Sequence, residues 1–85
     1  MQYTFEGFLK FFSKKNNRWY FQITVSRPTT KDENDNGRYG KVVETMFISE
    51  EFYGRLSVNS LGKICELVYQ YNGYRPELVD LKFSK

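Results

Sequence analysis

The chain has 85 residues, enough for one domain with a small hydrophobic core, and its formal net charge is +3. It contains no histidine and a single cysteine, Cys65. These counts exclude an internal disulfide, a zinc site built from Cys and His, and a Ser-His or Cys-His catalytic pair. We therefore expect a protein that is not an enzyme and holds no metal or other cofactor. The lone thiol, the lack of a secretory signal and the lack of a long apolar run predict a cytoplasmic protein with no membrane segment.

Aromatic residues are unusually frequent, with eight Phe, seven Tyr and one Trp. A small core cannot cover so many large rings, so some of them should be exposed or lie at an interface. The positive charge is concentrated in residues 1–27, where five basic residues stand against Glu6, whereas residues 28–85 are close to neutral. This asymmetry indicates a basic patch that faces an anionic partner. The alternative is a solvated face with lysines at a turn.

Residues 3–27 predict a β-hairpin with a polar turn at residues 13–17, because apolar side chains alternate on both sides of that turn. With a period of two, one face is apolar and contains Tyr3, Phe5, Gly7, Leu9, Phe11, Trp19, Phe21, Ile23 and Val25. The other face mixes rings, cations and polar groups and contains Glu6, Phe8, Lys10, Phe12, Arg18, Tyr20, Gln22, Thr24 and Ser26. Rings among cations on a sheet are typical of a surface for single-stranded nucleic acid, since bases stack and phosphates are neutralised.

Pro28 ends the second strand, and residues 29–40 are polar and rich in Gly and Asn, which predicts a long flexible loop. Arg38, Tyr39 and Lys41 form a second aromatic and basic cluster at the end of this loop. Residues 41–49 predict a third strand that is apolar on both faces and therefore central or covered on both sides. Ser49 is a predicted helix N-cap for a helix of about two turns.

Residues 62–71 predict a fourth strand and residues 78–83 a fifth, joined at Asn72-Gly73, a strong hairpin signal. A bulge at Tyr74 or a three-residue loop would pair Leu67 with Val79 and Cys65 with Leu81, which separates core from surface. We expect this register, with Cys65 as a small core residue.

Five strands with one short helix between the third and the fourth resemble the oligonucleotide/oligosaccharide-binding (OB) fold of small single-stranded-nucleic-acid-binding proteins. The resemblance lies in the element order, in Gly7 as a bend within the first strand, and in the closing stretch of residues 62–83. It implies a mainly β chain, with residues 1–85 forming a single five-stranded Greek-key barrel, and a phage or mobile-element origin. It also implies that ligands bind across strands two and three and the loops that join strands 1–2 and 4–5.

The nucleic-acid-binding residues expected from this resemblance and from the aromatic and basic clusters are Phe8, Lys10, Phe12, Lys14, Lys15, Arg18, Tyr20, Gln22, Arg38, Tyr39, Lys41, Tyr74 and Arg75. Each has a plainer interpretation. Phe8 and Phe12 can pack under the long loop or at a subunit interface, Tyr20 can be an ordinary cross-strand partner, and the turn lysines can simply be solvated. Glu44 and Glu77, expected near the same surface, work against an anionic ligand.

Two functions of different kinds fit these features. The first is a non-catalytic module that binds single-stranded DNA or RNA with low sequence specificity. The second is a protein-interaction module, such as a homo-oligomer subunit, that uses the exposed aromatic face, because interfaces favour the same residue types. A binder of small molecules or sugars is a third possibility.

Overall fold

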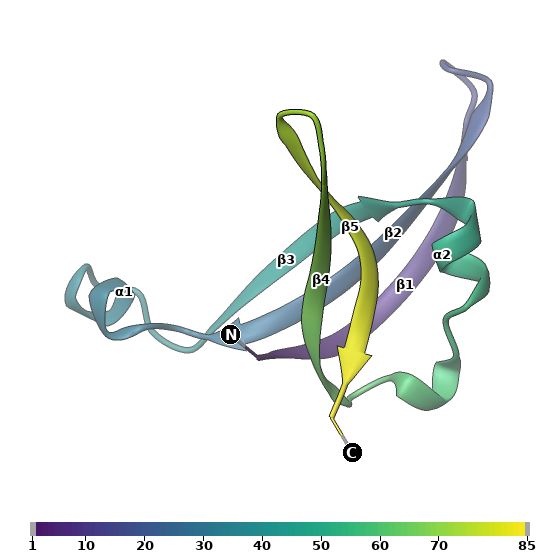
Figure 1. Cartoon of the computed structure of the whole chain (residues 1–85). Coiled ribbons are helices and arrows are strands. Elements are labelled where there is room, and N and C mark those ends of the chain that lie inside the picture. Colours follow the sequence, from purple (N-terminus) through teal and green to yellow (C-terminus); the bar gives the residue numbers. More distant parts are fainter. Residues whose placement is uncertain (1, 85) are drawn as a thin grey trace.

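The computed structural model describes residues 2–84, apart from the side chain of Asn72. It forms one antiparallel sheet in the order β3-β2-β1-β4-β5 (Figure 1). The strands are β1 (Tyr3–Ser13), β2 (Arg18–Pro28), β3 (Lys41–Ile48), β4 (Ile64–Asn72) and β5 (Arg75–Phe83). Two short helices, α1 (Lys31–Asp35) and α2 (Glu50–Gly54), and a 3₁₀ turn, η1 (Val58–Ser60), lie between the strands. The prediction of a mainly β chain with five strands is confirmed.

The sheet consists of a β1–β2–β3 meander and a β4–β5 hairpin that crosses in front of it (Figure 1). The joint between them is short, since the β1–β4 ladder pairs only Tyr3 with Cys65 and Thr4 with Ile64. The backbone of Phe5 extends the joint, because its carbonyl accepts a hydrogen bond from the Gly62 N–H at 2.7 Å. Among the described residues no ladder joins β3 to β5, so the sheet stays open between these two edges.

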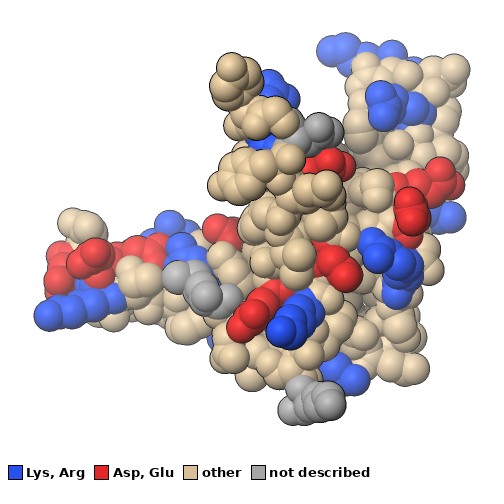
Figure 2. Space-filling view, in the orientation of Figure 1, with Lys and Arg blue, Asp and Glu red and all other residues tan. Residues whose placement is uncertain are grey.

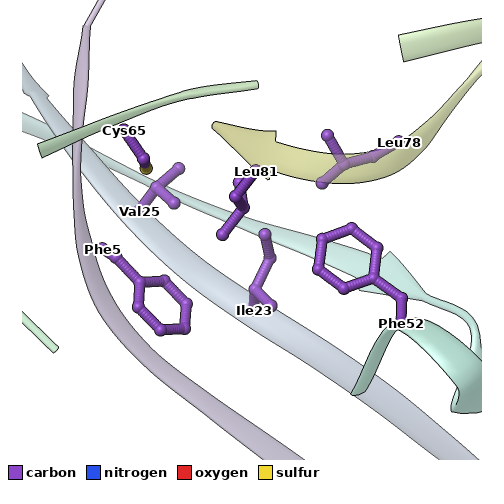
Figure 3. Close-up of a cluster of buried hydrophobic side chains, with 7 residues drawn as sticks. All are labelled: Phe5, Ile23, Val25, Phe52, Cys65, Leu78 and Leu81. Atoms are coloured by element: carbon purple, nitrogen blue, oxygen red, sulfur yellow. The ribbon is translucent and has the colours of Figure 1, made fainter. Parts of the chain in front are cut away.

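The core lies between the meander and the β4–β5 hairpin, and α2 closes one side of it (Figure 3). Its buried members are Phe5, Ile23, Val25, Phe52, Cys65, Leu78 and Leu81. We call the face of the sheet that carries these side chains the inner face and the opposite one the outer face. Burial raises the pKa of the Cys65 thiol, and the prediction that Cys65 is a core residue is confirmed.

A β-bulge at Glu6 changes which residues of β1 face the core. Phe5 lies opposite Val25 and Gly7 lies opposite Thr24, so Glu6 is an extra residue without a partner on β2. One extra residue reverses the side-chain alternation beyond it. Phe8, Lys10 and Phe12 therefore share the inner face, whereas Leu9 and Phe11 turn outward. The bend expected at Gly7 is present, but the predicted faces of β1 beyond it are wrong.

The β4–β5 register also differs from the prediction. Leu67 pairs with Leu81 and Cys65 with Phe83, across a turn at Gly73-Tyr74. The bulge is at Val79, between the pairs Val68–Asp80 and Tyr69–Leu78. This arrangement turns both Leu78 and Leu81 inward and places Glu66 opposite Lys82 instead of opposite Asp80. Opposite charges in a cross-strand pair are the more stable choice, which explains the observed register.

Residues 29–40 contain a helix that the sequence analysis did not predict. Thr30 and Glu33 form a capping box at the start of α1, in which each side chain bonds the backbone N–H of the other residue. Arg27 at the end of β2 donates to the Glu33 carboxylate at 2.6 Å. This contact holds the pKa of Glu33 at about 2, below its ordinary value, mainly through the Arg27 hydrogen bond. The flexibility of the segment stays a prediction.

The predicted cap of α2 is confirmed, whereas the predicted position of β3 in the sheet is wrong. Ser49 caps α2 as expected, because its hydroxyl accepts a hydrogen bond from the Phe52 N–H at 3.1 Å. In contrast, β3 is an edge strand and not a central one. Its outward side chains Val43 and Phe47 are 64% and 63% exposed. The apolar residues on both faces of β3 thus mark an exposed surface rather than a covered strand.

Candidate nucleic-acid interface

Three rings cross the outer face of the meander, one from each strand. Phe11 of β1 lies 5.6 Å from Tyr20 of β2 between ring centroids, and Tyr20 lies 5.8 Å from Phe47 of β3. We call these residues the outer aromatic row. The guanidinium carbon of Arg18 lies 5.3 Å from the centroid of the Tyr20 ring. The row is a ring surface with a cation directly on it, which is how a base and its phosphate can be held together.

Two hollows meet at the end of this row. One, of about 630 Å³, lies where β2 extends beyond the end of β3 and is lined by Arg18, Tyr20 and Phe47 among others. The second, of about 360 Å³, is lined by Phe47 and by Arg75 to Leu78 at the start of β5. Phe47 lines both hollows, with Arg18 lining the first and Arg75 the second. Glu50 lines the first hollow and Glu77 the second, which gives each a carboxylate as well.

The tip of the β1–β2 hairpin is strongly basic. Figure 2 shows Lys and Arg side chains at this tip and no Asp or Glu beside them. Between Gly7 and Lys31 the sequence contains no acidic residue. Within the described part of the chain, Lys10, Lys14, Lys15 and Arg18 form no salt bridge. These cations are thus available to an anionic ligand.

The structure separates the predicted residues of β1 from those of β2. Arg18, Tyr20 and Gln22 lie on the outer face as expected, next to Phe47 and Phe11. Phe8 packs against the core, with its ring 5.7 Å from Phe5 between centroids. Phe8 thus packs beside the core and α2, whereas the sequence predicted a ligand-binding position or packing under the 29–40 segment or at a subunit interface.

Lys10 and Phe12 lie on the inner side of the hairpin, beyond the core. The ring of Phe12 packs edge-on against Trp19 at 5.5 Å, and Lys10 Nζ lies 5.4 Å from the centroid of the Trp19 ring. Phe12 is 44% exposed and Trp19 is 52% exposed. We call Lys10, Phe12 and Trp19 the inner tip cluster. It is a second aromatic and basic surface on the opposite side of the same hairpin.

The second predicted cluster, at the end of the 29–40 segment, is not joined to the outer aromatic row. Figure 1 places α1 and the neighbouring loop at the end of the molecule opposite the β1–β2 tip. Lys41 and Phe47 point to the same side of β3 but are separated by about 20 Å along the strand. Tyr39 is 75% exposed and has no ring neighbour among the described residues. The structure therefore brings Arg38, Tyr39 and Lys41 close to each other but not to Tyr20.

Tyr74 and Arg75 lie at the tip of the β4–β5 hairpin. Tyr74 is fully exposed, and Arg75 opens β5 and lines the hollow beside Phe47. Figure 1 shows the β4–β5 and β1–β2 tips extending toward the same end of the molecule. Of these two predicted residues, Arg75 lines a hollow that includes Phe47 of the outer aromatic row.

Glu44 does not belong to this surface, although it was expected near it. It lies on the inner side of β3 opposite Val25. Burial raises the pKa of Tyr3, and the Glu44 carboxylate raises it further. The pKa of Tyr69 is raised by burial and, to a lesser extent, by Tyr3 and Glu44. This acid therefore acts on inner tyrosines and leaves the outer aromatic row without a carboxylate from β3.

Phe11 and Phe47 belong to the outer aromatic row but were not among the predicted binding residues. Phe11 was assigned to the core because the alternation was extended through Gly7 without a bulge. A glycine inside an apolar strand is the available signal for a bulge, and applying it would have turned Phe11 outward. For Phe47 the signal was present too, because a strand that is apolar on both faces can also be an exposed edge.

Comparisons with protein-family models, curated proteins and solved structures find no match for this chain. No helix among residues 2–84 has the length and apolar character needed to cross a bilayer. Over the same residues, no group of His, Cys, Asp or Glu side chains is placed to hold a metal ion. The outer aromatic row itself presents ring faces and the guanidinium group of Arg18.

Proposed function

We propose that this protein is a non-catalytic module that binds single-stranded DNA or RNA with low sequence specificity. The observation that carries the proposal is the outer aromatic row, which runs from the Arg18 side of the meander to the hollow beside Arg75. Rings accept any base, because every base has a flat face, whereas cations neutralise the backbone. A duplex hides the faces of its bases within the stack, so the row favours unpaired strands.

We also propose that the fold is a partly open OB-like Greek-key barrel. Two features on the open side of the sheet support it. The Tyr69 hydroxyl of β4 lies 3.6 Å from the Met46 sulfur of β3, and β3 shares a hollow with the start of β5. The sheet is thus curled far enough for its first and last strands to approach. In OB folds the face of strands two and three binds the ligand, which here is the face that carries Tyr20 and Phe47.

The experiment is a fluorescence-anisotropy titration of a labelled single strand of about 20 nucleotides at about 50 and 200 mM salt, with duplex as competitor. We expect binding that prefers the single strand and weakens at the higher salt. Tyr20→Ala should weaken it by about 5- to 150-fold, the range for one base stack. Tyr39→Ala, the same substitution at the far end of the molecule, is the matched control. Equal losses in the two variants, or no binding at low salt, would refute the proposal.

A second candidate is a protein-interaction module, and the edge strand β3 is what favours it. Val43 and Phe47 expose apolar surface beside an unpaired strand edge, which can receive a strand from another chain. Light scattering after size-exclusion chromatography tests self-association. An oligomer that Val43→Ser dissociates, with nucleic-acid binding absent, would favour this candidate.

A further inference from the structure

The tip of the β1–β2 hairpin forms an arm that no other element within residues 2–84 covers. β3 stops at Ile48, opposite Phe21, whereas β2 begins three residues earlier at Arg18. On the inner side the last neighbour is Tyr53 of α2, whose ring lies 5.1 Å from that of Phe21. Beyond this point the arm is a two-stranded ribbon with both faces open to solvent (Figure 1).

The two faces of the arm carry the same kind of surface. On the outer face Phe11 neighbours Tyr20 at 5.6 Å, with Arg18 over the tyrosine ring at 5.3 Å. On the inner face Phe12 neighbours Trp19 at 5.5 Å, with Lys10 over the indole at 5.4 Å. Each face thus has a pair of rings from adjacent strands and one cation on a ring.

The charge of the arm selects an anionic occupant for both faces. No acidic residue occurs from Gly7 to Thr30, and Lys14 and Lys15 at the turn lie between the two faces. An apolar protein surface would leave these cations without partners. A single-stranded nucleic acid satisfies both parts of each surface, because its bases stack on the rings and its phosphates meet the cations.

We propose that the arm binds single-stranded nucleic acid on both faces at once, with one segment on the outer aromatic row and another on the inner tip cluster. This inference rests on the proposed function and extends it. A long strand bends round the Ser13–Arg18 turn and occupies both faces, whereas short strands occupy them as two separate molecules. The turn lysines contact the phosphates at the bend.

Trp19 is the only tryptophan of the chain. It belongs to the inner tip cluster and also lines the hollow beside Tyr20, so its fluorescence is compared between the wild type and a variant of the outer aromatic row. The test uses thymidine dinucleotides, whose two bases match the pair of rings on one face. Native mass spectrometry counts the strands bound per chain, and Trp19 quenching that persists in the variant of the outer aromatic row reports stacking on the inner face. We expect two strands per chain and quenched emission in the wild type. The Tyr20→Ala/Phe47→Ala variant should bind one strand and keep the quenching, whereas Phe12→Ala/Trp19→Ala should bind one strand on the outer face.

One strand per chain with unchanged Trp19 emission would overturn the two-faced arm and leave the proposed function intact. One strand with quenched emission would also overturn it, because a single face then holds the ligand. Anisotropy that shows no binding at all would refute the proposed function itself. Since Phe12 and Trp19 lie outside the core, their variants should keep the wild-type circular dichroism spectrum, which serves as the folding control.

Discussion

Phe8 lies directly opposite Ile23 in the β1–β2 ladder, so both side chains point to the inner face. The Phe8 ring contacts Phe5 and, edge-on, Tyr53 of α2. This placement makes Phe8 a packing residue and distinguishes it from Phe11, which lies three residues later on the other face. Residues three apart in a regular strand point to opposite faces, and the bulge at Glu6 makes Phe8 the one that faces the core.

Phe8→Ala should therefore destabilise the protein by about 2–3 kcal/mol, since the ring is half-buried in the core cluster. Phe11→Ala should cost about 1 kcal/mol or less, because it removes an exposed ring. Urea unfolding followed by circular dichroism measures both. Equal costs for the two variants would show that the face assignment is wrong.

The turn lysines should govern the salt dependence of binding. For single strands, each phosphate contact contributes about 0.7 to the slope of log affinity against log salt. Replacing both Lys14 and Lys15 by alanine should then reduce the slope by about 1.4. Lys63→Ala/Lys82→Ala removes the same charge at the opposite end of the sheet and should leave the slope almost unchanged. A similar change of slope in both double variants would indicate a diffuse electrostatic effect.

The Arg27–Glu33 pair predicts a loss of stability in acid. Hydrogen bonds from Arg27 first and from the Thr30 backbone second lower the pKa of Glu33 from 4.5 to about 2, so the folded state favours the ionised carboxylate. The stabilisation is complete above pH 4.5 and is lost as the pH falls toward 2. Thermal melting temperatures measured across this window should fall more for the wild type than for Glu33→Gln. Asp35→Asn, which removes an acid from the same helix without touching Arg27, should behave like the wild type.

The reactivity of the Cys65 thiol measures how well the core excludes solvent. Its side chain is fully buried and burial raises the pKa of the thiol, so both access and thiolate formation oppose modification. We expect the native protein to resist a thiol reagent such as Ellman's reagent and to react at once in denaturant. The rate in water then measures opening of the β1–β4 joint. Rapid modification of the native protein would contradict the burial of Cys65.

Features that depend on neighbouring residues in the sequence could be predicted. The polar turn between β1 and β2 and the Ser49 cap follow from local turn and capping chemistry, and both were found. The α1 helix could also have been predicted, because the spacing Thr30-x-x-Glu33 is a capping-box signature. It was overlooked since polar, glycine-rich segments generally lack regular structure.

The positions of the bulges at Glu6 and Val79 could not be predicted from neighbouring residues in the sequence. A bulge leaves one residue of the ladder unpaired, and the compensating contacts come from residues distant in the sequence. Phe8 packs against Tyr53, and Leu78 is buried in the core. The bulge at Glu6 decides which residues of β1 belong to the candidate site. Arg18 and Tyr20 lie on β2, where the alternation is regular, and they are on the predicted face, whereas Phe11 and Phe12 lie on the faces opposite to those predicted.

The short joint between the two parts of the sheet has a consequence for how the chain folds. The meander and the β4–β5 hairpin form through contacts between neighbours in the sequence, whereas the pair Tyr3–Cys65 must close a loop of about sixty residues. Docking of the preformed hairpin onto β1 is therefore the step that sets the folding rate. Substitutions at the joint should slow folding, whereas changes in the arm should leave the folding rate unaffected.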